Sequence, residues 1–393
     1  MLIEIIIALL LGCTIGTFTG LIPGIHINLI GVTLVALSFS LLSTIQPIFL
    51  IVFIVAMAIT HTFLDFIPSI FLGCPDTDTE LSVLPGHDLL KKGKGYEALL
   101  LTNNGSIAAI LILLIIFIPA IFLIDNFYGA IKVFIPYILI LVSITLIALQ
   151  KNKVNAIKVF LLTGLLGFLV LNINLDQSLL PLLTGLFGAS SIIISLKNKT
   201  KLPKQILTKP KLKLKPVLGA AIAAPICSFL PGLGSGQAAI IGNTISKTNK
   251  QGFLTLLGAT NTLVMAFSFL SLYTIEKTRT GAALALKKII DTISTNNLVL
   301  IMITILLSAI ISYFLTKKLA KFLALNFNKI NYTKLSITTL IILILLVLII
   351  SGPIGLLILI VSTITGIYSI SLKVKRTNMM GCLLIPTIIL FLF

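Results

Sequence analysis

The sequence predicts an all-α polytopic membrane protein, and three observations support this prediction. Hydrophobic residues make up 58% of the 393-residue chain and charged residues only 10%, against about 25% in an average soluble domain. Apolar runs of 18–25 residues, the length that crosses about 30 Å of hydrocarbon, recur along the chain. Most of the 29 lysines and arginines lie beside these runs. This composition excludes an ordinary soluble enzyme, a nucleic-acid-binding domain and a disordered protein.

The apolar segments fall into two groups, and several of them are too short for a full crossing. They cover residues 2–22, 27–45, 48–72, 107–124, 131–149, 154–171, 179–196, 217–230, 238–245, 253–273, 298–314, 335–350, 354–372 and 379–393. A short apolar segment fits a broken or re-entrant helix whose end is surrounded by protein. We therefore expect about 10–12 transmembrane or re-entrant helices.

A basic linker separates the two groups. Eight lysines lie within residues 197–215, which leaves residues 1–196 as a first transmembrane repeat and residues 216–393 as a second. Lysine-rich loops stay in the cytoplasm and also attract anionic lipid headgroups. Glu4 stands where a cleaved signal peptide carries basic residues. We expect a multi-pass protein of the plasma membrane whose first apolar segment remains as a span.

Two Pro-Gly pairs interrupt the apolar segments at matching places in the two halves. Residues 20–28 and residues 228–237 each end an apolar run with Pro-Gly and continue with small or polar residues. Proline and glycine cost a helix about 3 and 1 kcal/mol, and hydrocarbon cannot hydrogen-bond the backbone groups that they release. Paired interruptions are typical of secondary transporters built from two inverted repeats. A plain proline kink or an interfacial turn is the alternative for each pair.

The half-helices that follow these breaks are expected to direct their N-terminal N–H groups into one cavity, which favours a bound anion. Residues 95–104 and 252–261 form a second echo, and each ends in asparagine. The predicted substrate-binding residues are Pro23, Gly24, His26, Asn28, Pro231, Gly232, Gly234, Ser235 and Gln237. The residues predicted to line the cavity are Asn103, Asn104 and Asn261.

Acidic residues are concentrated in one short stretch of the first half. Six of the 11 acidic residues lie between residues 65 and 97, and His61 and Asp65 share a helix face. An ionised Asp inside a span costs about 2.5–3.5 kcal/mol, so it normally faces a partner or water. The candidates for proton or sodium coupling are His61, Asp65, Asp76, Asp78 and Glu80. A structural hydrogen-bonded pair and a solvated loop are the alternatives for this stretch.

The chain carries no motif of a catalytic, nucleotide or metal site. It lacks the phosphate-binding GxxxxGK[ST] loop, the GxSxG nucleophile turn and the HExxH zinc motif. Cys13, Cys74, Cys227 and Cys382 are far apart and form no CxxC pair. We expect a protein that is not an enzyme and holds no metal or cofactor, with Na⁺ or H⁺ as its coupling ion.

Four motifs, in this order, resemble the large permease of tripartite tricarboxylate transporters, the TctA family. They are the first Pro-Gly pair, the loop of residues 74–99 with its basic Gly-containing turn, residues 180–190, and the second Pro-Gly pair with Asn261 after it. The resemblance implies an inverted-repeat secondary transporter. It also implies two partner subunits, a small membrane protein and an extracytoplasmic binding protein.

The chain departs from the family pattern at two places. Asp76, Asp78 and Glu80 stand where the family has small residues, and a later Leu-Gly-Ile-Pro-Gly motif has no counterpart here. Extra carboxylates near a site disfavour a tricarboxylate. Membrane proteins that move polyprenyl phosphates also carry paired Pro-Gly loops, and the chain resembles them more distantly.

The expected function is ion-coupled transport of a small organic anion, a carboxylate, by alternating access around the paired breaks. The alternative is a translocase of a polyprenyl-phosphate-type lipid, whose phosphate fits the same helix N-termini. A membrane scaffold that does not transport is a third class. The expected partners are the substrate or lipid, membrane lipids and the two subunits, without nucleic acid; a homodimer is one option for assembly.

The linker gives a topological prediction. By the positive-inside bias, residues 197–215 lie in the cytoplasm, and a pseudo-twofold axis in the membrane plane relates the halves. A membrane-impermeant lysine reagent should modify the linker in inside-out vesicles but not in intact cells. Halves related by an axis along the membrane normal would contradict the prediction.

Overall fold

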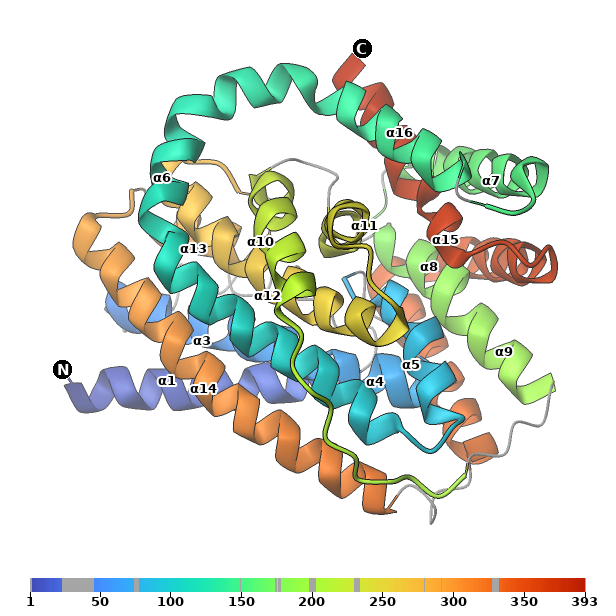
Figure 1. Cartoon of the computed structure of the whole chain (residues 1–393), viewed down its shortest axis with the longest axis horizontal. Helices are drawn as coiled ribbons and strands as arrows, with labels where there is room; N and C mark the ends of the chain where they lie inside the picture. Colours follow the sequence, from blue (N-terminus) through green and yellow to red (C-terminus); the bar gives the residue numbers. More distant parts are fainter. Residues whose placement is uncertain are drawn as a thin grey trace.

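The fold is described by a computed structural model and consists of packed helices (Figure 1). The residues described are 2–22, 46–73, 78–148, 150–173, 175, 178–197, 203–229, 234–278, 280–290, 292–326 and 332–392. The helices before the linker are α1 (Leu2–Leu21), α3 (Pro47–Leu64), α4 (Phe66–Leu72), η1 (Glu80–Ser82), α5 (Val83–Leu90), α6 (Gly95–Ala148), α7 (Lys153–Leu171), α8 (Leu179–Leu183), η2 (Thr184–Ala189) and α9 (Ser190–Lys197). The helices after it are α10 (Leu214–Phe229), α11 (Ser235–Ser246), α12 (Lys250–Ile275), α13 (Gly281–Ile289), α14 (Thr295–Asn326), α15 (Tyr332–Ser371), η4 (Arg376–Met380) and α16 (Gly381–Leu392).

The predicted class, an all-α polytopic membrane protein, is confirmed. Within the described residues there are seven helices long and apolar enough to span a membrane, and four shorter apolar helices. Two pairs of predicted apolar segments each belong to one helix: residues 107–124 and 131–149 to α6, and residues 335–350 and 354–372 to α15. The long helix α6 runs through Pro119 and Pro136 and changes direction along its length (Figure 1). Helix α15 is continuous apart from a kink at Gly352, whose φ of 64° is left-handed, followed by Pro353.

Helices α1 and α3 run side by side in the same direction. Three glycines spaced one turn apart on α1 (Gly12, Gly16 and Gly20) lie against successive turns of α3, so a Cβ on any of them would crowd that helix. Small residues at such a spacing let two helices approach closely in a membrane. The chain between the two helices, residues 23–45, is outside the described residues.

Helices α10 and α11 form an antiparallel hairpin. Gly219 on α10 and Gly242 on α11 pack backbone against backbone, with Ser246 beside them. Helix α11 has 12 residues, so it is only about 18 Å long at 1.5 Å per residue. This is too short for a full crossing of about 30 Å. This length fits a re-entrant hairpin better than two full crossings.

Helices α1 and α3 run in the opposite direction to helices α10 and α12. Gly95, at the start of α6, lies against Phe71 near the end of α4, and Gln251 of α12 bonds Glu97 of α6. Thus α1 and α3 run toward the side of the membrane from which α12 departs. Pro216 at the start of α10 lies beside α12 on that same side. This is the arrangement that inverted repeats require, with one Pro-Gly pair following α1 and the other following α10.

The second sequence echo, residues 95–104 and 252–261, lies at the starts of α6 and α12. Equivalent helices of inverted repeats point in opposite directions, but α6 and α12 begin together on one side, joined by the Glu97–Gln251 bond. They cross where a Cβ on Gly105 would overlap the carbonyl oxygen of Thr255 and a Cβ on Gly258 would overlap that of Thr102. The glycines at this crossing, Gly105 and Gly258, are not the pair that the echo shares, which is Gly95 and Gly252.

The crossing of α6 and α12 predicts a stability effect. Gly105→Ala and Gly258→Ala should each lower the free energy of unfolding, because overpacking costs about 1–3 kcal/mol. Gly129→Ala is the matched control, since no atom lies within 4 Å of a Cβ there and the substitution gains the same helix propensity of about 1 kcal/mol. Unfolding can be followed with a thiol-reactive dye, because Cys13, Cys227 and Cys382 are buried. Equal stability of all three variants would contradict the prediction.

Candidate functional site

The structure describes part of the predicted site. The predicted residues that lie outside the described residues are Pro23, Gly24, His26, Asn28, Asp76, Pro231 and Gly232. The predicted residues that it describes are His61, Asp65, Asp78, Glu80, Asn103, Asn104, Gly234, Ser235, Gln237 and Asn261. Most of these lie at contacts between the two halves of the chain, and each contact is described below.

The N-terminus of α11 binds a carboxylate of the first half. The backbone N–H of Ser235 donates to Asp78 Oδ1 at 3.1 Å, and the Ser235 hydroxyl lies 2.9 Å from the same oxygen. That hydroxyl is also 2.8 Å from the backbone oxygen of Asp78. A carboxylate at this position satisfies N–H groups that the helix cannot, and it meets the positive end of the helix dipole.

A second carboxylate lies over the next residue of the helix. Glu80 is 1% exposed, and a Cβ on Gly236 would overlap its Oε1 atom. A side chain at residue 236 would therefore displace the Glu80 carboxylate from this position. Sequence reasoning assigned Asp78 and Glu80 to ion coupling and the start of α11 to substrate binding. The tertiary structure brings the two sets together across 157 residues of sequence.

The first turn of α11 also carries an amide that is only partly used. Gln237 is buried, and its Oε1 accepts from the backbone N–H of Gly234 at 2.7 Å. This bond holds the amide at the N-terminal end of the helix. Its Nε2 has no hydrogen-bond partner among the described residues. The turn thus offers a buried donor beyond those that hold Asp78.

A buried carboxylate joins the halves at the break between α3 and α4. Asp65 is 2% exposed, and its Oδ2 accepts from Asn261 Nδ2 of α12 at 2.7 Å. One turn away, Thr62 Oγ1 lies 3.2 Å from Thr262 Oγ1. A carboxylate, two hydroxyls and an amide are oxygen donors of the kind that alkali and alkaline-earth cations bind. An amide can present its oxygen by rotating.

The remaining predicted residues lie at other helix contacts. His61 Nδ1 is 3.1 Å from Thr19 Oγ1 of α1. Although His61 is only four residues before Asp65, its partner therefore lies on a different helix from Asn261, the partner of Asp65. Asn103 donates to the backbone oxygen of Tyr313 at 3.0 Å, and Asn104 accepts from the Tyr313 hydroxyl at 3.4 Å. These two asparagines therefore join α6 to α14, whereas Asn261 faces Asp65.

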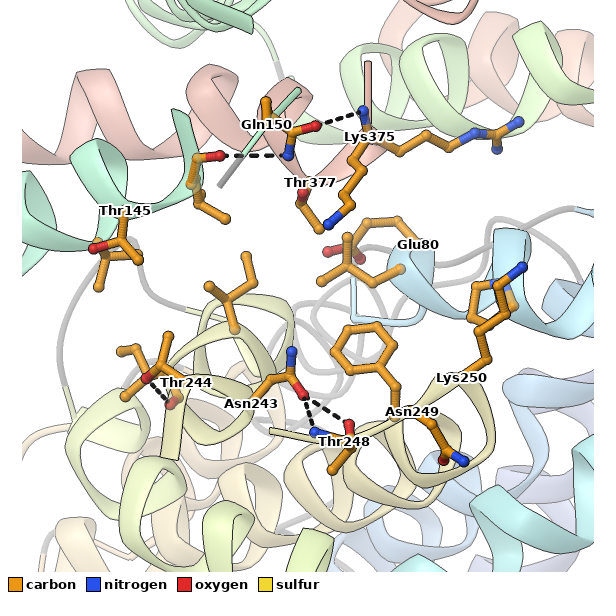
Figure 2. A pocket seen from close by; sticks show the side chains of 18 of the residues that line it. Glu80, Thr145, Gln150, Asn243, Thr244, Thr248, Asn249, Lys250, Lys375 and Thr377 are labelled. Atoms are coloured by element: carbon orange, nitrogen blue, oxygen red, sulfur yellow. Dashed lines mark hydrogen bonds between the residues drawn. The ribbon is translucent and has the colours of Figure 1, made fainter. Parts of the chain in front are cut away.

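A cavity of about 530 Å³ lies between α6, α11, the start of α12 and η4 (Figure 2). Aliphatic side chains of α6 and α11 form much of its wall. Its charged lining residues are Glu80, Asp88, Lys250, Lys375 and Arg376. Lys250 forms an ion pair with Asp88. Apart from Glu80, no sequence pattern indicated this lining, because its basic residues lie at the start of α12 and at the start of η4, which only the fold brings together.

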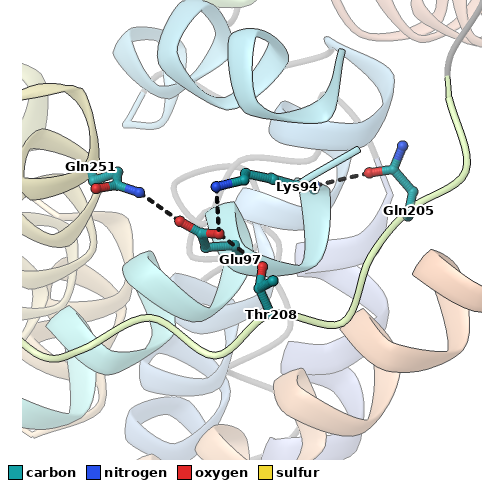
Figure 3. Close-up of polar contacts among 6 residues, drawn as sticks. Lys94, Glu97, Gln205, Thr208 and Gln251 are labelled. Atoms are coloured by element: carbon teal, nitrogen blue, oxygen red, sulfur yellow. Dashed lines mark hydrogen bonds and ion pairs between the residues drawn. The ribbon is translucent and has the colours of Figure 1, made fainter. Parts of the chain in front are cut away.

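A polar clamp ties the linker to both halves (Figure 3). Glu97 accepts from Gln251 Nε2 at 2.6 Å and from Thr208 Oγ1 at 2.8 Å, and Lys94 lies 3.6 Å away. Gln205 accepts from the backbone N–H of Gly95 at 2.9 Å. Described linker residues are therefore fixed across the starts of α6 and α12.

Comparison with known proteins identifies the family of this chain. Residues 6–381 match the Tripartite tricarboxylate transporter TctA family. The chain belongs to this family. An uncharacterized protein of Methanocaldococcus jannaschii is 34% identical over 398 residues, with 98% of each chain covered. No solved structure matches the chain.

This TctA protein is therefore a multi-pass protein of the plasma membrane and belongs to a family of membrane transporters. Family membership agrees with the resemblance inferred from the four motifs. TctA proteins are one component of a tripartite transport system.

His87 of α5 lies beside the acidic stretch and outside the candidate spans. Gly73 has a φ of 72°, and a Cβ there would lie 2.8 Å from His87 Nε2. Burial, with the nearby charges of Lys91 and Arg376, lowers the pKa of His87 to about 3, against an opposing effect of Asp88. The imidazole is therefore neutral in the folded protein at neutral pH.

The lowered pKa of His87 predicts a pH dependence of stability. Between its ordinary pKa of 6.5 and about 3, the unfolded chain binds a proton at this residue and the folded chain does not. The free energy of unfolding should therefore fall as pH drops below 6.5. His87→Gln should flatten this decline between pH 7.5 and 5, measured as the thermal midpoint, whereas Gly129→Ala should keep the wild-type slope. An unchanged slope in His87→Gln would contradict the assignment.

Proposed function

We propose that this TctA protein is an ion-coupled secondary transporter of a small carboxylate. The observation that carries the proposal is the contact of the α11 N-terminus with the Asp78 carboxylate, through Ser235 N and Oγ. The helix end lies at the turn of a re-entrant hairpin, so it combines carboxylate recognition with a position inside the membrane. Alternating access would move α1 and α3 relative to α10 and α12, around this end.

The coupling ion is proposed to act at Asp65. Its carboxylate is buried in a candidate span and contacts Asn261 of the other half. Binding of H⁺ or Na⁺ there changes the charge at a contact between the halves, and a change at such a contact can favour one of two packings. We propose no cofactor, no metal beyond a coupling cation and no enzymatic activity.

The family also supports a proposal about partners. A small membrane subunit and an extracytoplasmic binding protein would complete a tripartite system, with the binding protein delivering the carboxylate. The linker clamp lies on the side from which α10 and α12 begin, which is the cytoplasmic side if the lysine bias holds. The binding protein would then dock on the opposite side.

A second candidate function is supported by the cavity of about 530 Å³. Aliphatic residues of α6 and α11, among them Leu141 and Ile240, line it together with basic residues. Such a lining fits a lipid chain with a phosphate head, as in a translocase of polyprenyl-phosphate-type carriers. It ranks second because Asp88 and Glu80, which repel a phosphate, also line the cavity.

Uptake into proteoliposomes tests the first candidate. Labelled pyruvate, succinate and citrate should be compared with a Na⁺ gradient, with a proton gradient and with neither. At least one carboxylate should accumulate only with a gradient. Lipid transfer without carboxylate uptake would favour the second candidate.

Asp65→Asn tests the coupling site in the same vesicles. It should abolish gradient-driven accumulation while the folded protein keeps its thermal midpoint, because the amide fills the same volume but has no negative charge to bind a proton or neutralise a cation. Asp125→Asn removes an exposed carboxylate of α6 and should accumulate substrate like the wild type. Retention of ion dependence in Asp65→Asn, with lowered stability, would show that Asp65 is only structural.

A further inference from the structure

The start of α11 holds more charge and more donors than a simple helix cap needs. Asp78 Oδ1 accepts from the backbone N–H of Ser235 at 3.1 Å and lies 2.9 Å from the Ser235 hydroxyl. A cap requires one such acceptor. Glu80 adds a second carboxylate directly over Gly236. Both come from the loop between α4 and α5, in the other half of the chain.

A donor at this helix end is left for a further ligand. Gln237 is 1% exposed, and its Oε1 is held by the Gly234 N–H. The Nε2 atom of the same amide is buried and makes no hydrogen bond within the described part of the chain. A buried donor without an acceptor costs free energy. A ligand with a second carboxylate oxygen, displacing Asp78, would use Ser235 and Gln237 together.

We propose that Asp78 is a built-in occupant of a carboxylate site, which the transported carboxylate displaces. The inference rests on the proposed function in taking the ligand to be the transported species. An external carboxylate offers the same oxygens as Asp78 to the same donors.

Chemical rescue tests the occupant. Asp78→Ala removes the carboxylate but leaves Ser235 and Gln237 in place. Sodium acetate, compared with sodium chloride at equal ionic strength, should raise the thermal midpoint of this variant by roughly 2–4 °C and leave the wild type unchanged. Adding Ser235→Val to Asp78→Ala should remove most of the shift, and Asp125→Ala should show no acetate effect.

Absence of an acetate-specific shift in folded Asp78→Ala would overturn the proposal. If the variant is not recovered folded in chloride, the readout is the yield of monodisperse protein purified in acetate or in chloride. Acetate should then restore the yield, and equal yields would overturn the proposal too.

Carboxylate uptake by the wild type without acetate rescue of Asp78→Ala overturns only this inference. Acetate rescue without carboxylate uptake overturns only the proposed transport.

Discussion

The structure depends on one constraint, which is that a helix ending inside a membrane must have its N–H groups satisfied by protein. Helix α11 is too short to cross, so its first turn lies away from bulk solvent. The first half of the chain meets this requirement with Asp78, which accepts from Ser235. The contact joins the two halves at a turn that would otherwise be costly. The same donors make this turn suitable for a carboxylate ligand.

Close packing holds the interrupted elements around this contact. Gly105 and Gly258 let α6 and α12 cross backbone against backbone, and Gly219 and Gly242 do the same within the α10–α11 hairpin. Without a hydrophobic driving force between helices in lipid, such contacts and interhelical hydrogen bonds stabilise the bundle. Ser106 adds one of these bonds, from its hydroxyl to the backbone oxygen of Gly258 at 2.9 Å.

Two acidic groups at the interface, the buried Asp65 and the partly buried Asp78, have different surroundings. Asp78 is bound by the end of a helix and has the positive end of its dipole nearby. Asp65 contacts the neutral amide of Asn261 and lies near threonine hydroxyls. A carboxylate paired with a neutral amide responds to a proton or a cation, whereas one held by a helix end responds to a competing anion. The interface thus separates the proposed coupling and substrate sites.

The linker adds a tie between the halves at one side of the membrane. Glu97 bonds Thr208 of the linker and Gln251 of α12 while it belongs to α6. Any movement of α6 against α12 must preserve or break these bonds. The lysines further along the linker remain exposed, so the segment combines a fixed polar clamp with a positive surface.

The sequence alone determined the membrane class, the two Pro-Gly interruptions and the family, because composition, apolar length and backbone chemistry are local properties. It also singled out Asp65, Asp78, Glu80, Ser235 and Asn261 as polar groups in costly places. Only the tertiary structure decided their partners. Ser235 meets Asp78 across 157 residues of sequence, and Asn261 meets Asp65 rather than Asn104. Such pairings depend on helix direction and crossing, which no local pattern encodes.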